Sequence, residues 1–222
     1  MGLEFCDPLL DPPRRALYER LYQGLSRWEE TIPCGSFPPG DVNRVLKDIL
    51  LDHPELAQFE GKWAFRDGVC PQYVLTSEEV RQMQTAAKQA FSRLSKKDLP
   101  RSAYVWLLRH VAYDQTVPHS QNAYGTLVQR RAVCKGIAKT YQLMMRLGNI
   151  PCILVEGTLD GVTKHVWNMV YAENRWRHVD VTMGYPIFRP LVGAEDEFGG
   201  LLLTTEAISR SHGIRNVDNL PK

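Results

Sequence analysis

Several features that mark common protein classes are missing from this 222-residue chain. No apolar run approaches the ~20 residues of a membrane-spanning helix. The N-terminal stretch MGLEFCDPLLDPPRR has prolines and acids where a signal peptide needs a basic start and an apolar segment. We therefore expect no membrane contact and a cytoplasmic location, although a secreted chain that had lost its export signal would look the same.

The chain also lacks a strong charge of either sign. Twenty-seven Lys and Arg stand against 25 Asp and Glu, which gives a formal net charge of +2, and the basic residues are spread along the chain. A nucleic-acid-binding domain usually gathers its basic residues into a patch or an arm. We therefore expect no nucleic-acid partner. The sequence is silent on oligomeric state.

Paired cysteines are missing as well. The five cysteines are scattered, odd in number and without CxxC spacing: Cys6, Cys34, Cys70, Cys134 and Cys152. This pattern argues against a disulfide framework and against a structural zinc site. We expect no cofactor and no bound metal, and at least one thiol has no partner within the chain.

Periodicity and turn residues predict a helical first half and a mixed second half. Helices are expected at 14–30, 41–53, 77–94 and 102–113, with short strands at 59–65 and 72–75. Residues 114–133 show no sustained periodicity and predict a long loop of the kind that often carries function. We expect a mainly helical N-terminal region, residues 1–100, packed on a core of residues 101–222.

The loop leads directly to a cysteine at the start of a helix. Apolar residues at helical spacing follow Cys134, and Gly148 and Asn149 supply the stop signal. Three strands are expected next, at 152–158, 164–171 and 175–182. A two-residue turn at Glu173 and Asn174 would then set His165 opposite Thr182 and one diagonal step from Asp180.

These positions suggest nucleophilic catalysis. A carboxylate beside a histidine orients the imidazole and stabilises its charged form, which suits a general base. A thiol in the first turn of a helix feels the positive end of the helix dipole, and a neighbouring imidazolium lowers its pKa further. Cys134, His165 and Asp180 are therefore the candidate nucleophile, base and orienting acid, although each alone has an ordinary structural explanation.

The same residues carry a family resemblance. The segments NAYGTLV, AVCKGIAKTYQLMMRLGNIPC, HVWNMV and WRHVDVTMG resemble core motifs of bacterial transglutaminase-like proteins, a branch of the papain-like cysteine enzymes. The resemblance implies an α+β fold in which the cysteine helix packs on an antiparallel sheet. It assigns catalysis to the same three residues, and places Tyr124 near the active site. Trp167 is a candidate wall of the substrate cleft.

The expected activity is thiol-dependent acyl transfer on a protein or peptide substrate through a thioester, by hydrolysis or by transfer to an amine. Two alternatives remain. In the first, the chain is a catalytically idle module that binds a peptide in the same groove. In the second, His165, His178 and Asp180 form a metal site, because the two histidines and the aspartate share one face of the sheet.

Overall fold

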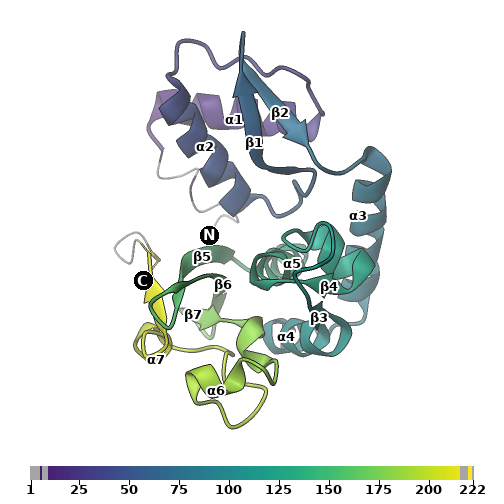
Figure 1. Ribbon diagram of the computed structural model, residues 1–222, viewed down its shortest axis with the longest axis vertical. Helices are drawn as coiled ribbons and strands as arrows, with labels where there is room; N and C mark the ends of the chain where they lie inside the picture. The colour runs from purple at the N-terminus through teal and green to yellow at the C-terminus, as the bar shows by residue number, and fades with distance from the viewer. Residues whose placement is uncertain (1–5, 7–9, 216–219, 222) are drawn as a thin grey trace. The chain divides into compact units, whose positions relative to one another are not determined.

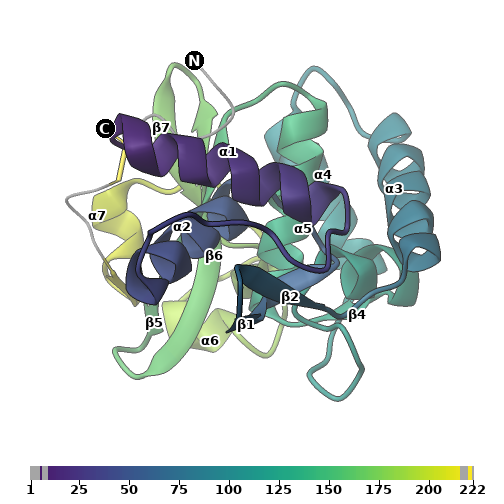
Figure 2. The ribbon, with the colours of Figure 1, turned by 90° about the horizontal axis from the view of Figure 1, so that it is seen from above.

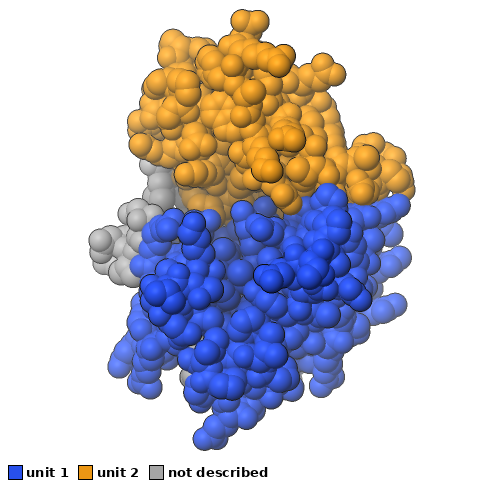
Figure 3. Space-filling view, viewed as in Figure 1, with its two compact units in different colours: residues 1, 82–222 blue, residues 2–81 orange. Residues whose placement is uncertain are grey.

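The computed structural model describes residue 6, residues 10–215 and residues 220–221 (Figure 1). It divides into two compact units, residues 2–81 and residues 82–222, which Figure 3 distinguishes by colour. The division falls inside α3 (Ser77–Ser92). Within the described ranges, no helix has both the length and the apolar character needed to cross a bilayer. The expected domain boundary at residue 100 stays a prediction.

The N-terminal unit consists of two helices and a hairpin. The helices are α1 (Pro12–Ser26) and α2 (Pro39–Asp52), and β1 (Phe59–Phe65) pairs antiparallel with β2 (Val69–Tyr73) (Figures 1 and 2). One apolar cluster, which includes Leu21, Ile49 and Phe59, joins these elements. The unit therefore has a core of its own.

Three helices start earlier than the periodicity predicts. α1 begins at Pro12 rather than residue 14, α2 at Pro39 rather than 41, and α4 (Leu99–His110) at Leu99 rather than 102. Each has proline in its first turn. An N–H at this position would have no acceptor within the helix, so its absence costs no hydrogen bond, and the fixed φ of proline already suits a helix. Asp11 and Asp98 cap two of them by accepting a backbone N–H. These prolines begin helices rather than break them.

The second unit contains α3, α4 and α5 (Cys134–Leu147) together with a four-stranded sheet. The capping box predicted at the start of α3 is present, because Thr76 Oγ1 accepts the Glu79 N–H while the Glu79 carboxylate accepts the Thr76 N–H. α5 is buried around most of its circumference, from Gly136 to Met145, rather than along one stripe.

The sheet is antiparallel and has the strand order β7-β6-β5-β8. Its strands are β5 (Cys152–Leu159), β6 (Thr163–Ala172), β7 (Arg175–Val179) and β8 (His212–Ile214). Ala172 pairs with Arg175 across the predicted two-residue turn, which confirms the register of this hairpin. α5 packs against β5 and β6 (Figure 1). The expected α+β class, with the cysteine helix on an antiparallel sheet, is confirmed.

The third strand is shorter than the sequence predicts. β7 ends at Val179 rather than residue 182, and a 3₁₀ turn, η3 (Val181–Gly184), follows it. The Asp180 side chain caps this turn by accepting the Thr182 N–H at 2.9 Å. Thr182 therefore has no strand partner, and His165 pairs with Gly157 of β5 on its other side.

The segment between α4 and α5 is more ordered than a plain loop. It contains a two-residue strand, β3 (Ala112–Tyr113), that pairs in parallel with β4 (Arg131–Ala132), and a π-helical turn, η2 (Gly125–Gln129). The short helices α6 (Arg189–Val192) and α7 (Thr205–Ile208) follow η3. The β3–β4 pair places residue 113 beside the start of α5.

Candidate active site

Cys134 is the first residue of α5 and follows an extended residue, Val133. Its side chain is partly exposed, although the helix behind it is buried. The first N–H groups of a helix have no intrahelical partner, so this end carries partial positive charge and favours an anion. The helix thus presents a thiol at its electropositive end, at the boundary between core and solvent.

His165 and Asp180 are in direct contact. His165 on β6 directs its Nε2 at the Oδ2 atom of Asp180, 2.6 Å away, and both side chains are buried. The contact expected from the hairpin register is therefore present, although Asp180 lies just beyond the end of β7. Burial alone would raise the pKa of Asp180, but the charge and hydrogen bonds of the histidines hold it well below its usual range.

The Cys134 thiol and His165 also interact. Burial favours the neutral thiol, but the hydrogen bond to His165 and its charge lower the pKa of Cys134 below its ordinary value. Burial opposes protonation of His165, yet Asp180 and Cys134 together raise its pKa to about 10. Since Nε2 of His165 faces Asp180, the other ring nitrogen, Nδ1, is left for the thiol. The two shifts move the pair toward a thiolate and an imidazolium.

Two further groups contact the thiol, and the sequence analysis missed both. The backbone N–H of Val166 lies near the thiol and contributes to the lowered pKa of Cys134. The Tyr113 hydroxyl lies close to Cys134, and burial together with the nearby thiol raises the pKa of Tyr113 to about 12. Tyr113 was assigned to the end of a helix, and only its pairing with Ala132 shows that it lies beside Cys134.

His212 is a third residue that the sequence analysis missed. Its Nε2 lies 3.0 Å from the same Asp180 oxygen that His165 contacts, and its Nδ1 lies 2.8 Å from Ser211 Oγ. The side chain is 1% exposed. It reaches the site because β8 pairs with β5. The two strands are far apart in the sequence, and no turn or periodic pattern between them predicts this pairing.

His178, which the metal alternative required, does not contact His165 or Asp180; its ring nitrogens have other partners. Its Nδ1 accepts the Trp167 indole N–H at 3.0 Å, and its Nε2 lies 3.1 Å from Thr205 Oγ1. Both ring nitrogens are therefore occupied. Within the described part of the chain, the histidine and carboxylate atoms that converge belong instead to His165, Asp180 and His212.

The spacing of these three groups suits hydrogen bonds better than a metal. Zinc bonds of 2.0–2.2 Å in tetrahedral geometry keep neighbouring ligand atoms roughly 3.3 Å apart. The His165 and His212 nitrogens lie 2.6 and 3.0 Å from Asp180 Oδ2. A carboxylate oxygen only accepts, so each of these nitrogens carries a proton that a metal would have to replace.

A cavity of about 320 Å³ opens onto the thiol and the imidazole. Its lining includes Cys134, His165, Lys135, Lys164, Glu156 and Arg215. Tyr124 is not among the lining residues and packs edge-on against His119. Trp167 is 1% exposed and stacks beneath His165. The substrate-binding roles expected for Tyr124 and Trp167 therefore stay predictions.

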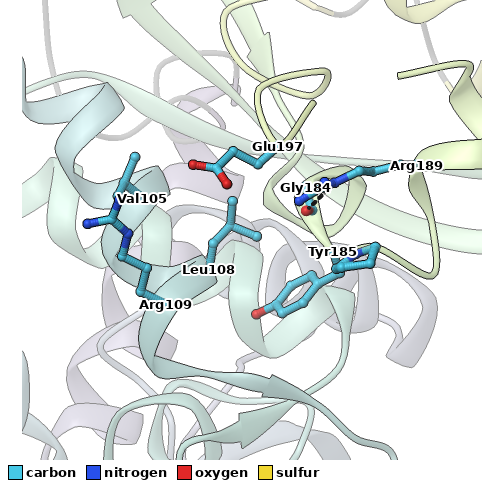
Figure 4. Close-up of a pocket in the computed structure, with 8 residues that line it drawn as sticks. Val105, Leu108, Arg109, Gly184, Tyr185, Arg189 and Glu197 are labelled. Carbon is cyan, nitrogen blue, oxygen red and sulfur yellow. Dashed lines mark hydrogen bonds between the residues drawn. The ribbon is translucent and has the colours of Figure 1, made fainter. Parts of the chain in front are cut away.

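A second, smaller cavity lies at the end of η3. Its volume is about 110 Å³, and it is lined by residues of α4 together with Gly184, Tyr185, Arg189 and Glu197 (Figure 4). Arg189 Nε donates to the Gly184 carbonyl at 3.0 Å. Its lining lacks a thiol, a serine or a histidine, so the candidate nucleophile lies at the larger cavity.

Comparisons with known proteins match the part of the chain that contains α5 and the β5–β7 strands of the sheet. The family model described as the transglutaminase-like superfamily matches residues 84–181. Kyphoscoliosis peptidase of Homo sapiens is 28% identical over 100 residues, and that of Mus musculus is 27% identical. Each match covers 38% of this chain and 15% of the relative, so the chain corresponds to a small part of those proteins.

Solved structures give a weaker likeness. A crystal structure of a TGase aligns with a TM-score of 0.42 and 15% identity, covering 49% of this chain and 34% of that one. The bacterial branch expected from the motifs stays a prediction, since the curated relatives are mammalian. The family match spans α4, α5 and the β5–β7 strands, so this part of the chain is similar to the transglutaminase-like superfamily.

Proposed function

We propose that this protein is a thiol-dependent enzyme that transfers acyl groups of protein or peptide substrates, with Cys134, His165 and Asp180 as its catalytic triad. The observation that carries the proposal is the position of His165 between a thiol and a buried carboxylate. The lowered pKa of Cys134 supports a resting thiolate. The superfamily match supports a thiol enzyme in general terms.

The reaction has two halves. The Cys134 thiolate attacks the acyl carbonyl, and the His165 imidazolium gives its proton to the leaving amine or ammonia as the carbon–nitrogen bond breaks. A thioester remains on Cys134. His165 then takes a proton from water or from an amine, which attacks the thioester and releases the thiolate. Asp180 accepts the Nε2 hydrogen bond throughout and stabilises the imidazolium.

The developing oxyanion needs hydrogen-bond donors. The backbone N–H of Cys134, at the start of α5, is one candidate. Tyr113 is the second, because its hydroxyl already lies at this N–H and at the thiol. Its raised pKa keeps the hydroxyl protonated, so it can donate at neutral pH. The oxyanion would accept hydrogen bonds from the Tyr113 hydroxyl and from the Cys134 N–H.

Mass spectrometry of candidate substrates, incubated with and without a primary amine, separates the possible outcomes. Water at a peptide bond cleaves the chain, water at a glutamine side chain adds about one dalton, and an amine leaves a covalent adduct. Cys134→Ala serves as the inactive control. If the wild-type protein modifies no substrate while still binding peptides, the idle binding module replaces this proposal.

A further inference from the structure

The cavity at Cys134 and His165 carries unbalanced positive charge. Lys135 directly follows Cys134 on α5, and Lys164 directly precedes His165 on β6. A third cation, Arg215, lies 3.9 Å from the one acidic residue of the lining, Glu156. Neither lysine has an acidic partner among the residues that the structure describes. The electropositive end of α5 adds to the same field.

This concentration is local, because the whole chain carries a net charge of only +2. We propose that the cavity selects acyl donors with a carboxylate side chain close to the reacting carbonyl, that is, acidic peptide segments. The inference rests on the proposed function. Two lysines are too few for a nucleic-acid backbone, but each can pair with one carboxylate near the cavity mouth.

The size of the effect is modest. Exposed pairs between ammonium and carboxylate groups change an equilibrium or a rate by about two- to fivefold each. A substrate with two well-placed carboxylates would therefore gain about an order of magnitude in kcat/KM. Salt at 1 M, with a screening length of about 3 Å, should remove most of this preference.

Alkylation of Cys134 by an anionic and a neutral reagent tests the charge without a known substrate. The ratio of the iodoacetate rate to the iodoacetamide rate should fall about two- to fivefold in Lys135→Gln and in Lys164→Gln, and further in the double variant. Lys88→Gln, at an exposed position of α3, is the matched control and should leave the ratio unchanged.

The outcomes separate the two proposals. If neither reagent labels Cys134, the nucleophile itself is wrong. If both label it and the double variant keeps the wild-type ratio, the charge inference alone fails. Glutamate-containing donor peptides should also outperform their glutamine counterparts, and Lys135→Glu with Lys164→Glu should cancel that preference. A preference that survives this double reversal overturns the inference.

A separate observation concerns His212. Asp180 is fully enclosed, and its Oδ2 accepts hydrogen bonds from two imidazoles, while Oδ1 accepts the Thr182 N–H. We infer that His212 is a positioning residue, which holds this carboxylate against His165. The titratable groups around the network come from five elements: Tyr104 on α4, Tyr113 on β3, Cys134 on α5, His178 on β7 and His212 on β8.

Two variants distinguish positioning from simple packing. His212→Phe keeps a ring but removes the donor, so the buried carboxylate should hold the imidazolium less firmly. Alkylation of Cys134 at pH 6 should then slow about tenfold, with its acid limb moved to higher pH. His212→Gln restores an N–H donor and should recover most of the rate. If both variants lose thermal stability but keep the wild-type pH profile, His212 is a packing residue.

Discussion

The Trp167 indole N–H donates to His178 Nδ1 over 3.0 Å, and this hydrogen bond fixes the protonation state of His178. An indole nitrogen can only donate, so Nδ1 must be without a proton. Burial, assisted by the charge of His212, lowers the pKa of His178 to about 4. His178 is therefore neutral at physiological pH and supports the sheet, whereas the raised pKa of His165 favours its charged form.

The two histidines should respond differently to alanine. His165→Ala removes the base and should nearly abolish turnover with the fold intact. His178→Ala leaves the Trp167 N–H unpaired, so it should cost about 1–3 kcal/mol of unfolding free energy but less than about tenfold in turnover. Steady-state kinetics and urea unfolding measure both. Equal catalytic losses would contradict the assignment of His165 as the base and of His178 as a structural residue.

Cys134 should react with iodoacetamide ahead of the other four cysteines near neutral pH. Cys34 and Cys152 are buried, and burial raises the pKa of Cys152 well above its usual range. Burial and the charge of Asp52 raise the pKa of Cys6. Peptide mapping after brief labelling gives the order. Faster labelling of Cys6 or Cys70 in the folded protein would remove Cys134 as the activated thiol.

The pH dependence of alkylation and of turnover should report the titration of Cys134 and of His165. Because His165 lowers the pKa of Cys134, the thiolate should persist below the ordinary thiol pKa of about 8.5 and disappear as the pH falls through the lowered value. Turnover also needs a protonated His165, so it should decline as the pH rises through about 10. His165→Gln should move the alkylation midpoint upward. An unmoved midpoint would mean that the two side chains are uncoupled.

Asp180→Asn should slow turnover by about 10- to 1,000-fold, less than the roughly 10⁴ seen for this change in a serine triad. The reason is that a Cys–His pair already forms a thiolate and an imidazolium before substrate arrives. Cys134→Ala should lose nearly all activity, and substrate binding should change little in either variant. Full activity in Asp180→Asn would leave this residue as the cap of η3 alone.

Gly157→Ala should disturb the site from a distance. A Cβ there would meet the backbone oxygen of Gly213 on β8 and come within 2.7 Å of the Trp167 ring. The clash should cost about 1–3 kcal/mol of stability and push β8 away from β5. The variant should therefore share the shifted alkylation profile of His212→Phe. Gly40→Ala, at an exposed position of α2 with open space around its Cβ position, gives the control for a glycine-to-alanine change.

Local rules were enough for part of this fold. The β6–β7 hairpin was predictable because alternation and a two-residue turn fix its register, and that register alone brings His165 near Asp180. The α5 helix was predictable from its spacing and its glycine stop. In both cases the information lies within about ten to twenty residues of the element itself.

The rest depends on contacts that are distant in sequence. Tyr113 reaches Cys134 because β3 pairs with β4, and His212 reaches Asp180 because β8 adds to the edge of β5. Neither pairing has a turn or a periodic pattern that links its two strands. Strands of two or three residues are also too short to show alternation, so both residues were out of reach of pattern reading.

The place of β8 in the chain gives the site an order of assembly. During synthesis, Cys134, His165 and Asp180 leave the ribosome before His212, so a growing chain can pair β5, β6 and β7 while the aspartate still lacks its second imidazole. If His212 acts as inferred, the thiol gains its full reactivity only when β8 docks. By the effect expected for His212→Phe, docking of β8 would raise the alkylation rate of the thiol at pH 6 about tenfold.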